Sequence, residues 1–510
     1  MVKSSSNQRI VKNTMMLYIR MFLIMGVSFY TSRVILKALG VEDFGIYNVV
    51  GGVVSMLGLI KGVMSGATSR YLNFALGKED IELARKSFNV SLIIYIVLSA
   101  AFVLLAETVG LWFLNTQLVI PEDRIVAANW IYQFTIISSV NQMIAVPFNA
   151  AVIAREEMSV FAYISVLEVV LRLLIVYLLF ISRVDKLIAY GFLYMLTNLL
   201  ITEIYRLYCR KHYPESHFNF YKDKSLYIEI LSYSSWNLMG QIAKLIKGQG
   251  LNILLNMFFN PAVNASRALS YQINNGINQF VQNFYIAVGP QVTKYYARNE
   301  MENMFNLVCR SAKMALFLFV LFALPVSIEA PMLIQLWLGQ QPENVVEFVR
   351  IILLISMLDS IQIPLKTSAQ ATGKIAKYEM TISVITILNI PISFALLKFG
   401  YPAITVFVVS LCLSTVSFIA RLILLQGMIS FPIIRYLNYV VVRSVMVILL
   451  SAIIPLLLHN KLADSTINSF LVILVALVCE GLVMYFLGLN RQEKEFVNGI
   501  VKNRLNIKKK

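Results

Sequence analysis

Stretches of apolar residues, each close to 20 residues long, recur along the chain from Met15 to Leu487. Each is long enough to cross a hydrocarbon layer about 30 Å thick as a helix, in which the backbone satisfies its own hydrogen bonds. Strands of a membrane barrel would be about half as long and would alternate apolar with polar positions. We therefore expect an all-α polytopic membrane protein. The pattern predicts 14 transmembrane helices, at about residues 13–38, 42–68, 87–113, 125–152, 157–182, 186–209, 225–259, 261–292, 305–330, 345–371, 377–398, 401–428, 435–458 and 465–488.

Three segments of the first half recur in the second half, in the same order. The pairs are 69–89 with 293–313, 111–123 with 336–345, and 145–158 (AVPFNAAVIAREEM) with 362–380 (QIPLKTSAQATGKIAKYEM). Chance similarity among leucine-rich helices is the alternative, but it does not explain a common order and a nearly constant offset. The repeat predicts two six-helix bundles with the same topology, related by an axis along the membrane normal, as in some secondary transporters. Two helices remain at the C-terminal end.

The longest polar connection separates the two predicted bundles and sets the domain boundaries. The predicted segments are an N-terminal six-helix bundle at 1–209, a cytoplasmic connecting loop at 210–224, a C-terminal six-helix bundle at 225–430, transmembrane helices 13 and 14 at 431–490, and a basic cytoplasmic tail at 491–510.

Each copy of the repeat places a proline inside the fourth helix of its bundle, at Pro147 and at Pro364. A proline in a helix removes one backbone hydrogen bond and favours a kink. We therefore predict that the two prolines form paired hinges near the inner mouth of the protein.

The basic residues predict the orientation in the membrane. Cytoplasmic loops are enriched in Lys and Arg. Most of the 44 Lys and Arg residues fall in the two tails and in the loops on the same side as the tails. Both termini are therefore expected in the cytoplasm, which requires an even number of spans.

Composition excludes several classes of protein. Hydrophobic residues make up 58% of the chain and charged residues 14%, which is unlike a soluble globular protein. The net charge of +17 follows the membrane topology, so nucleic acid is not an expected partner. The four cysteines lack metal-ligand spacing, and no disulfide or metal is expected. There is no Walker A motif and no long external loop for a catalytic domain, so we expect no catalytic residues and no enzyme activity.

Lys244 and Lys247 are the most informative charges within the predicted spans. They lie three residues apart, so they share a helix face and repel each other, and no acid follows at i+3 or i+4. A charge at the membrane centre costs roughly 2.5–3.5 kcal/mol, so such residues usually face a cavity or a partner. We predict that both lysines line a water-filled cavity that binds an anion. Lys61 lies in a similar glycine-flanked sequence and is assigned to the same cavity.

Other charges within the spans have a simpler alternative. Glu168 and Arg172 lie four residues apart and Asp359 and Lys366 seven apart, so each pair can neutralise itself on one helix face. Arg20 lies within reach of the cytoplasmic interface and can extend its guanidinium there. Arg20 and Lys366 nevertheless remain candidate substrate-binding residues, with these structural roles as the alternative.

One polar stripe follows the predicted span at 261–292. Its residues recur at helical spacing and are Arg267, Tyr271, Asn274, Asn278 and Gln282. Amide side chains both donate and accept hydrogen bonds, which suits the hydroxyls of a sugar, and Tyr271 offers an aromatic face. Hydrogen bonding between helices is the alternative role for Asn and Gln in membranes. The number of polar residues on this span favours a cavity wall.

The N-terminal segment 9–53, and in particular LGVEDFGIYNVV, resembles bacterial polysaccharide (O-antigen) flippases of the Wzx type. These belong to the MOP superfamily, together with the lipid II flippase MurJ and the MATE exporters. The resemblance extends over nearly the whole chain and implies a MATE-like fold that alternates between inward-open and outward-open states. It also implies a location in the bacterial inner membrane.

The resemblance further implies a cargo. Such flippases move an undecaprenyl-pyrophosphate-linked oligosaccharide repeat unit, a precursor of O-antigen, capsule or exopolysaccharide, from the cytoplasmic to the outer leaflet. Partners would be this lipid-linked oligosaccharide, membrane lipid and polysaccharide assembly proteins of the same membrane. No cofactor is expected, and coupling to H+, Na+ or the membrane potential stays open.

Two other functions stay open from the sequence. A MATE-like multidrug or cation antiporter would need buried carboxylates, whereas the first span offers Arg20 and no acid. A membrane glycan polymerase or ligase would need a large external loop with catalytic charges. A flippase remains the favoured interpretation.

Overall fold

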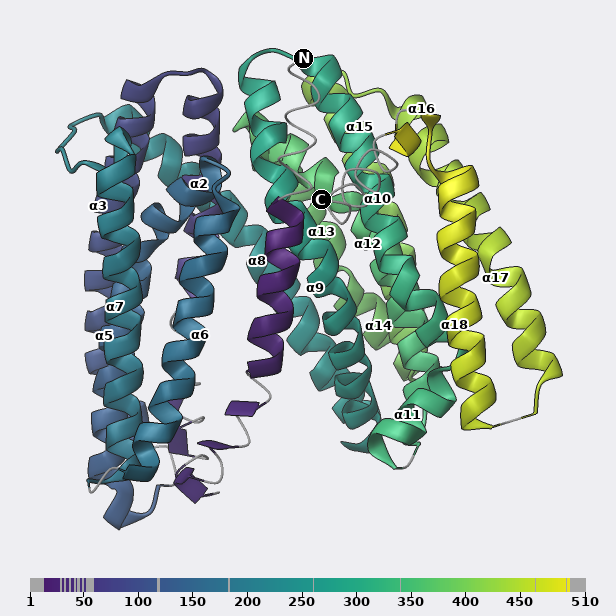
Figure 1. The fold of residues 1–510 in the computed structure, drawn as a ribbon, viewed down its shortest axis with the longest axis horizontal. Helices are drawn as coiled ribbons and strands as arrows, with labels where there is room; N and C mark the ends of the chain where they lie inside the picture. The colour runs from purple at the N-terminus through teal and green to yellow at the C-terminus, as the bar shows by residue number, and fades with distance from the viewer. Residues whose placement is uncertain are drawn as a thin grey trace, which may run out of the picture. The chain divides into compact units, whose positions relative to one another are not determined.

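The computed structural model of the chain describes residues 13–27, separate positions between 30 and 51, and residues 59–116, 120–181, 184–259, 261–339, 341–463, 465–491 and 493–495. The regular secondary structure of these residues is helical (Figure 1). The helices are Asn13–Val27, α2 (Leu59–Gly77), α3 (Ile81–Leu105), α4 (Leu111–Thr116), α5 (Ile125–Ala154), α6 (Met158–Ile181), α7 (Lys186–His212), α8 (Lys224–Phe258), α9 (Pro261–Ala297), α10 (Met301–Ile328), α11 (Ala330–Leu338), α12 (Val345–Thr372), α13 (Ala376–Ile387), α14 (Asn389–Lys398), α15 (Thr405–Ile429), α16 (Ile433–Tyr436), α17 (Arg443–Lys461) and α18 (Thr466–Val483).

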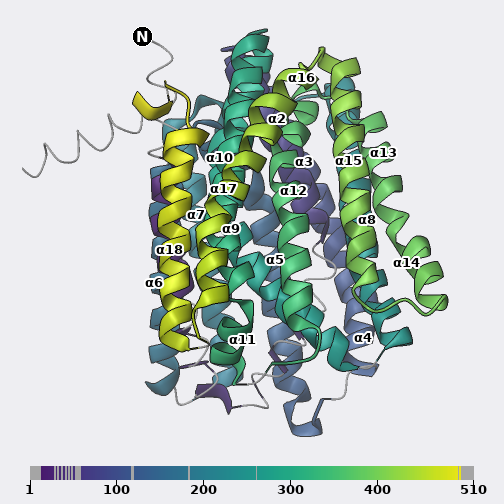
Figure 2. The ribbon, with the colours of Figure 1, turned by 90° about the vertical axis from the view of Figure 1, so that its right-hand side faces the viewer.

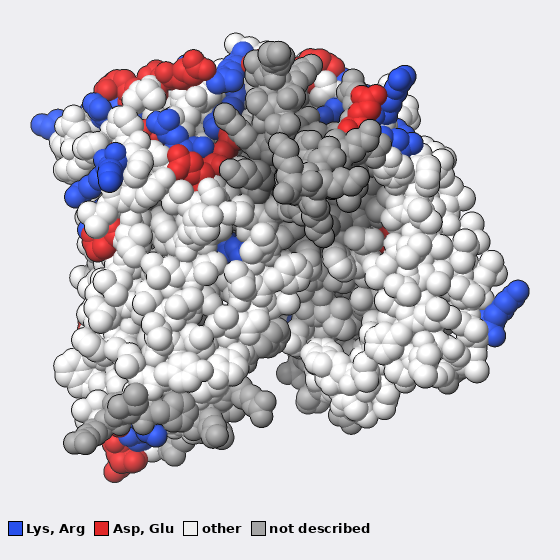
Figure 3. All heavy atoms as spheres, viewed as in Figure 1, with Lys and Arg blue, Asp and Glu red and all other residues white. Residues whose placement is uncertain are grey.

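Ten helical segments of the described residues are long and apolar enough to cross a membrane. They match ten of the predicted spans and are Ile81–Thr116, Glu122–Ala154, Met158–Leu179, Lys186–His212, Met301–Ile328, Val345–Thr372, Ala376–Lys398, Thr405–Ile429, Ile433–Lys461 and Thr466–Gly488. The chain is thus an all-helical polytopic membrane protein. On the face drawn in Figure 3, most charged side chains gather near helix ends and leave the surface between them largely uncharged.

Helices α8 and α9 occupy the positions of the seventh and eighth predicted spans. They have 35 and 37 residues, which is ample length for a span, but they are too polar to be among the ten apolar segments. The first two predicted spans, at about 13–38 and 42–68, are described only in part, as the helix Asn13–Val27, short stretches between residues 30 and 51, and α2.

The helices pack into two compact units. Unit 1 comprises Met1–Gln241, Ile286–Met301 and Gly373–Ala376, and unit 2 comprises Ile242–Tyr285, Glu302–Thr372 and Lys377–Lys510. The division falls inside α8 and α9, whereas the sequence places the domain boundary in the polar loop 210–224. Each of these two long helices contributes residues to both units. A domain boundary placed in a loop would instead leave each helix whole.

In unit 1, α5 packs against α2, α3 and α7 around a core of buried aliphatic and tyrosine side chains. The Tyr132 hydroxyl donates a hydrogen bond of 2.7 Å to the Ala106 carbonyl, which satisfies a buried polar group. Asp185 accepts hydrogen bonds from the backbone N–H groups of Leu187 and Ile188 at 3.0 and 3.1 Å and so caps α7. Arg124 binds Asp185 at 2.7 Å, which ties this cap to the start of α5.

Equivalent turns recur within unit 1 at positions related by the internal repeat. Glu79 follows α2 with a φ of 60°, and Asn299 follows α9 with a φ of 57°. Each turn closes with the same backbone bonds, Glu79 N–H to Leu76 O (3.2 Å) and Asn299 N–H to Tyr296 O (3.0 Å). Non-glycine residues rarely adopt positive φ. Glu156, after α5, forms the same turn with a φ of 62° and an N–H bond of 2.9 Å to the Ile153 carbonyl, so this turn follows three helices of unit 1.

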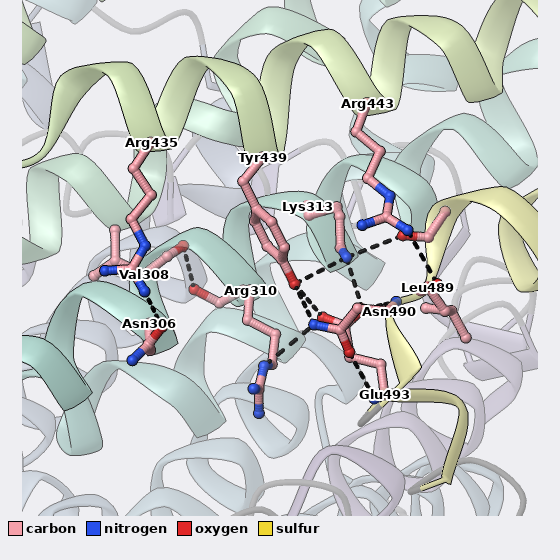
Figure 4. A network of polar contacts seen from close by, with 12 residues as sticks. Asn306, Val308, Arg310, Lys313, Arg435, Tyr439, Arg443, Leu489, Asn490 and Glu493 are labelled. Carbon is pink, nitrogen blue, oxygen red and sulfur yellow. Dashed lines mark hydrogen bonds and ion pairs between the residues drawn. The ribbon is translucent and has the colours of Figure 1, made fainter.

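In unit 2, α17 lies beside α18 in both ribbon views (Figures 1 and 2). A buried polar network ties this pair to α10 (Figure 4). The fully buried Lys313 ammonium donates to Glu493 at 2.7 Å, to the Gly488 carbonyl at 3.0 Å and to the Tyr439 hydroxyl at 3.1 Å. Tyr439 also donates to Glu493 at 2.8 Å. The network compensates the charge of a lysine that is buried in the protein.

Candidate substrate-binding cavity

Unit 2 contains a cavity of about 550 Å³ whose wall is mostly polar side chains on α8, α9, α12, α13, α14 and α15. The lining residues are Lys244, Lys247, Tyr271, Asn274, Asn275, Asn278, Gln279, Gln282, Ile352, Ile355, Ser356, Asp359, Ser360, Gln362, Ile363, Lys366, Ile385, Thr386, Asn389, Leu413, Ser414, Ser417 and Arg421. Seven of the ten residues predicted to bind substrate are among them. The volume is in the range of sites that bind small organic molecules.

The α8 side of the cavity carries two cations. Lys244 and Lys247 both line it, and Lys244 is exposed there. Within the part of the chain that the structure describes, neither ammonium makes an ion pair or a hydrogen bond. An uncompensated charge in a membrane protein is costly, so a site that keeps two of them one helical turn apart is suited to an anionic ligand.

The α9 side of the cavity is a wall of amides. Asn274, Asn278 and Gln282 recur along one face, as the sequence predicts, and Tyr271 lies on the same helix. Asn278 donates to the Ser356 hydroxyl of α12 at 3.4 Å, so this amide also joins two helices. The Asn274 side-chain oxygen is buried and accepts no hydrogen bond from the described residues. The stripe therefore combines the two roles that the sequence leaves open, contact between helices and free polar groups in a cavity.

The opposite wall is held by a hydrogen-bonded chain between α12, α13 and α15. Asp359 accepts hydrogen bonds from the Ser414 hydroxyl at 2.6 Å and from the Gln362 amide at 3.2 Å. The other end of the Gln362 amide accepts from Arg421 at 3.0 Å, and Arg421 also donates to the Tyr378 hydroxyl. Gln362 thus joins a carboxylate to a guanidinium, and its amide orientation is set by both partners.

Lys366 lines the cavity but pairs differently from the sequence-based expectation. Its ammonium lies 3.2 Å from Glu379 of α13, whereas Asp359 binds Ser414 of α15. Lys366 thus pairs with α13, and Asp359 binds α15 as well as Gln362 of its own helix, so the expected Asp359–Lys366 pairing is wrong. By contrast, the expected Glu168–Arg172 pair on α6 is present.

The remaining candidate residues lie elsewhere. Arg267 of α9 is not among the lining residues; it donates to the Gly248 carbonyl at 2.9 Å and lies 4.9 Å from the centre of the ring of Tyr271, which does line the cavity. Arg20 belongs to unit 1, where its guanidinium lies 4.3 Å from the centre of the Phe161 ring. Lys61 is part of α2, but its side chain lies outside the described residues.

Of the cavity wall that α12 and α15 supply, sequence reasoning placed only Lys366 in the candidate site, and it missed the α15 residues. A signal was present, because Ser410, Ser414, Ser417 and Arg421 recur at three- and four-residue intervals along one face of α15. Three of these four residues line the cavity. Serines are common at contacts between membrane helices, so the stripe alone does not distinguish a cavity from helix packing.

The two candidate hinge prolines lie where the repeat predicts them, inside α5 and α12. Pro147 is buried in unit 1, and Pro364 is buried in unit 2 close to the cavity-lining residues Gln362 and Lys366. Their role as hinges stays a prediction.

No protein-family model and no curated protein sequence matches the chain. Solved structures do match it. An outward-facing multidrug resistance MATE family transporter of the MOP superfamily has a TM-score of 0.69 at 13% identity, and the match covers 83% of this chain and 96% of that one. The MATE transporter ClbM in complex with Rb+ has a TM-score of 0.67 at 17% identity, with 81% and 94% covered. The Vibrio cholerae MATE transporter VcmN has a TM-score of 0.64 at 16% identity, with 83% and 98% covered.

Identities this low carry the fold and nothing finer, but the coverage is nearly complete for each matched chain. The expectation of a MATE-like fold is therefore confirmed, while the cargo is not addressed by these similarities. The chain is a polytopic, all-helical membrane protein with the fold of MATE transporters of the MOP superfamily.

Proposed function

We propose that this protein is a flippase that moves an undecaprenyl-pyrophosphate-linked oligosaccharide repeat unit from the cytoplasmic to the outer leaflet of a bacterial inner membrane. The observation that carries the proposal is the pair Lys244 and Lys247, two ammonium groups without partners among the described residues, in a polar cavity. A pyrophosphate supplies two or more negative charges in a compact group, which matches two cations one helical turn apart.

The rest of the cavity suits the sugars. The α9 amides offer donors and acceptors for hydroxyls, and Tyr271 offers a ring face. The lipid tail remains in the bilayer while the headgroup passes through the protein by alternating access. Both termini lie in the cytoplasm in this proposal, and the inside-negative potential favours outward movement of an anion by about 2.3 kcal/mol per charge per 100 mV.

The first test is deletion of the gene followed by analysis of lipid-linked oligosaccharides. A flippase defect gives an intermediate that accumulates on the cytoplasmic face and a loss of surface glycan. A multidrug or cation antiporter, the alternative that the MATE-like fold favours, gives unchanged glycan and increased drug sensitivity. That second outcome would refute the flippase proposal.

The second test addresses the site. The double substitution Lys244→Gln and Lys247→Gln should reduce headgroup translocation in reconstituted vesicles at least tenfold, with normal expression and folding. Lys398→Gln is the matched control, because Lys398 is an exposed lysine at the end of α14. Normal translocation by the double variant would exclude the cavity as the binding site while leaving the deletion result intact.

A further inference from the structure

The segment between α7 and α8 exposes two aromatic side chains in an otherwise polar connection. Phe218 is 56% exposed and Phe220 is 59% exposed. Both residues lie outside the helices, in residues 217–223, which project from the side of unit 1 beside α3 (Figure 1). Exposed phenylalanines on a membrane-spanning helix can contact lipid tails. Phe218 and Phe220 instead lie on a loop, among charged residues.

The loop is fixed to its unit rather than loosely attached. The Asn89 side chain donates to the His217 carbonyl at 3.1 Å and accepts from the Asn219 N–H at 2.9 Å. This pair of hydrogen bonds is the one that a neighbouring β-strand would make, so it holds Phe218 in an extended backbone. Asn89 is itself fully buried. The exposure of the phenylalanines is thus imposed by a buried anchor.

A second anchor holds the start of the loop. Glu215 is fully buried and forms a bidentate ion pair with Arg155, with distances of 2.9 and 2.8 Å. The nearby Asp223 accepts from the Leu226 N–H at 3.1 Å and caps α8. The two acids of this segment are therefore occupied by structural contacts, and Glu82 of α3 accepts a hydrogen bond from the Tyr221 hydroxyl of the loop at 3.3 Å.

The basic residues around the loop, unlike these acids, make no polar structural contacts through their side chains in the part of the chain that the structure describes. Arg210 and Lys211 precede it, Lys222 and Lys224 follow the phenylalanines, and all four are exposed. None of them makes an ion pair or a side-chain hydrogen bond with the described residues. Two outward-facing aromatic rings flanked by four uncommitted cations match the interface of a membrane that contains anionic lipid, because clustered Lys and Arg beside a span attract such headgroups.

We propose that residues 217–222 form a lipid-binding anchor. Phe218 and Phe220 insert into the headgroup region of the adjacent leaflet, and the four bases bind its anionic phospholipids. The anchor would hold this connection between α7 and α8 at the membrane surface. The proposal concerns a surface outside the cavity and does not depend on the cargo.

The test uses the full chain, purified and reconstituted into phosphatidylcholine vesicles with or without phosphatidylglycerol. Phe220→Trp is made in a background whose four tryptophans are replaced by Phe, and Asn219→Trp is the matched control. Successive residues of an extended segment point to opposite sides, so the two reporters sample different environments. The reporter at position 220 should be quenched several-fold more by brominated lipids than by aqueous iodide, and the control should show the reverse.

Charge is tested with the same reporter. Phosphatidylglycerol should increase bromolipid quenching at position 220 at least twofold, and Gln in place of all four bases should abolish this increase. If the tryptophan-free background does not fold, hydrogen exchange of residues 217–222 in the unmodified protein replaces it, with slower exchange expected in phosphatidylglycerol vesicles. Equal iodide quenching at both positions, or exchange independent of anionic lipid, would overturn the proposal. Slow hydrogen exchange of residues 217–222 in native membranes but not in lipid vesicles would also overturn the proposal, because it would indicate that another protein binds this loop.

Discussion

The hydroxyl of Tyr285 donates a hydrogen bond of 2.9 Å to the backbone carbonyl of Ser360. Ser360 lies four residues before Pro364, which has no N–H to offer, so this carbonyl lacks its normal helical partner. A tyrosine of α9 therefore replaces the missing bond of α12. This bond joins α9, which carries the amide wall of the cavity, to α12 at the predicted hinge of the opposite wall.

We predict that Tyr285→Phe lowers the free energy of unfolding by about 1–2 kcal/mol, because it leaves a buried carbonyl unsatisfied. The measurement is thermal or denaturant unfolding of the purified protein in detergent. Tyr163→Phe is the control, because Tyr163 is 66% exposed and its hydroxyl serves no comparable contact with the described residues. Equal effects of the two substitutions would contradict the account.

The Tyr285 contact and the proline should also be coupled. In a Pro364→Ala background, residue 364 regains an N–H that can donate to the Ser360 carbonyl. Tyr285→Phe should then cost about 1 kcal/mol less than in the parent protein, which a double-mutant cycle measures. Strict additivity would mean that the hydroxyl does not substitute for the missing helical bond.

Substitution of Lys366 and of Lys244 should have different effects on the free energy of unfolding. Lys366→Gln removes the partner of Glu379, whose side chain is 3% exposed, and should destabilise the protein by about 1–3 kcal/mol. Adding Glu379→Gln should restore most of that loss. Lys244→Gln should leave stability unchanged or higher and weaken binding of inorganic pyrophosphate, measured by calorimetry. A stability loss from Lys244→Gln would show that this ammonium has a structural partner.

The end of α2 should tolerate no side chain at Gly77. A Cβ there would lie 2.8 Å from the Lys294 Cα and 2.9 Å from the Ala297 Cβ of α9. Gly77→Ala should therefore cost about 1–3 kcal/mol through overpacking. Gly66→Ala is the control on the same helix, because a Cβ at Gly66 would meet no atom of the described residues within 4 Å. That substitution should be neutral or stabilise by up to about 1 kcal/mol. Similar losses at both sites would refute the proposed close contact.

The network around Glu493 predicts an acid-sensitive attachment of the C-terminal helices. Burial alone would raise the pKa of Glu493, but hydrogen bonds from Lys313, from the Asn490 backbone and from Tyr439 lower it below its ordinary value of 4.5. A lowered folded-state pKa means that the stabilisation is present above the ordinary value and is lost as the pH falls through the folded-state pKa.

The unfolding temperature in detergent should therefore be steady at neutral pH and fall below about pH 4.5. Glu493→Gln should be less stable at neutral pH and should lack this component of the decline. Parallel acid profiles for the two proteins would show that other carboxylates dominate.

Much of the fold was predictable because it depends on helix length and local pattern. The apolar segments from Ile81 to Ala154 and from Met301 onwards match the predicted spans, since the hydrocarbon thickness sets a length that composition reveals. The α8 lysines and the α9 amide stripe could likewise be placed on one wall each, because helical periodicity fixes which residues share a face.

Contacts between helices were less predictable. Lys366 pairs with Glu379 of the next helix rather than with Asp359 on its own, and periodicity gives no information about a neighbouring helix. The bridging role of Gln362 between Asp359 and Arg421 depends on the rotation of α12 and α15 about their axes. That rotation is decided by tertiary packing, not by local sequence.

The polar character of α8 and α9 has a consequence for how the protein is made. Neither helix is apolar enough to be counted among the membrane-spanning segments, although each is longer than most of them. Charges such as Lys244 and Lys247 raise the cost of moving such a segment from the translocon into lipid by itself. Insertion of α8 and α9 should then require that earlier helices remain beside the translocon. These helices would cover the polar faces of α8 and α9 as they enter the membrane. The residues that form the cavity would thereby also set the order of assembly.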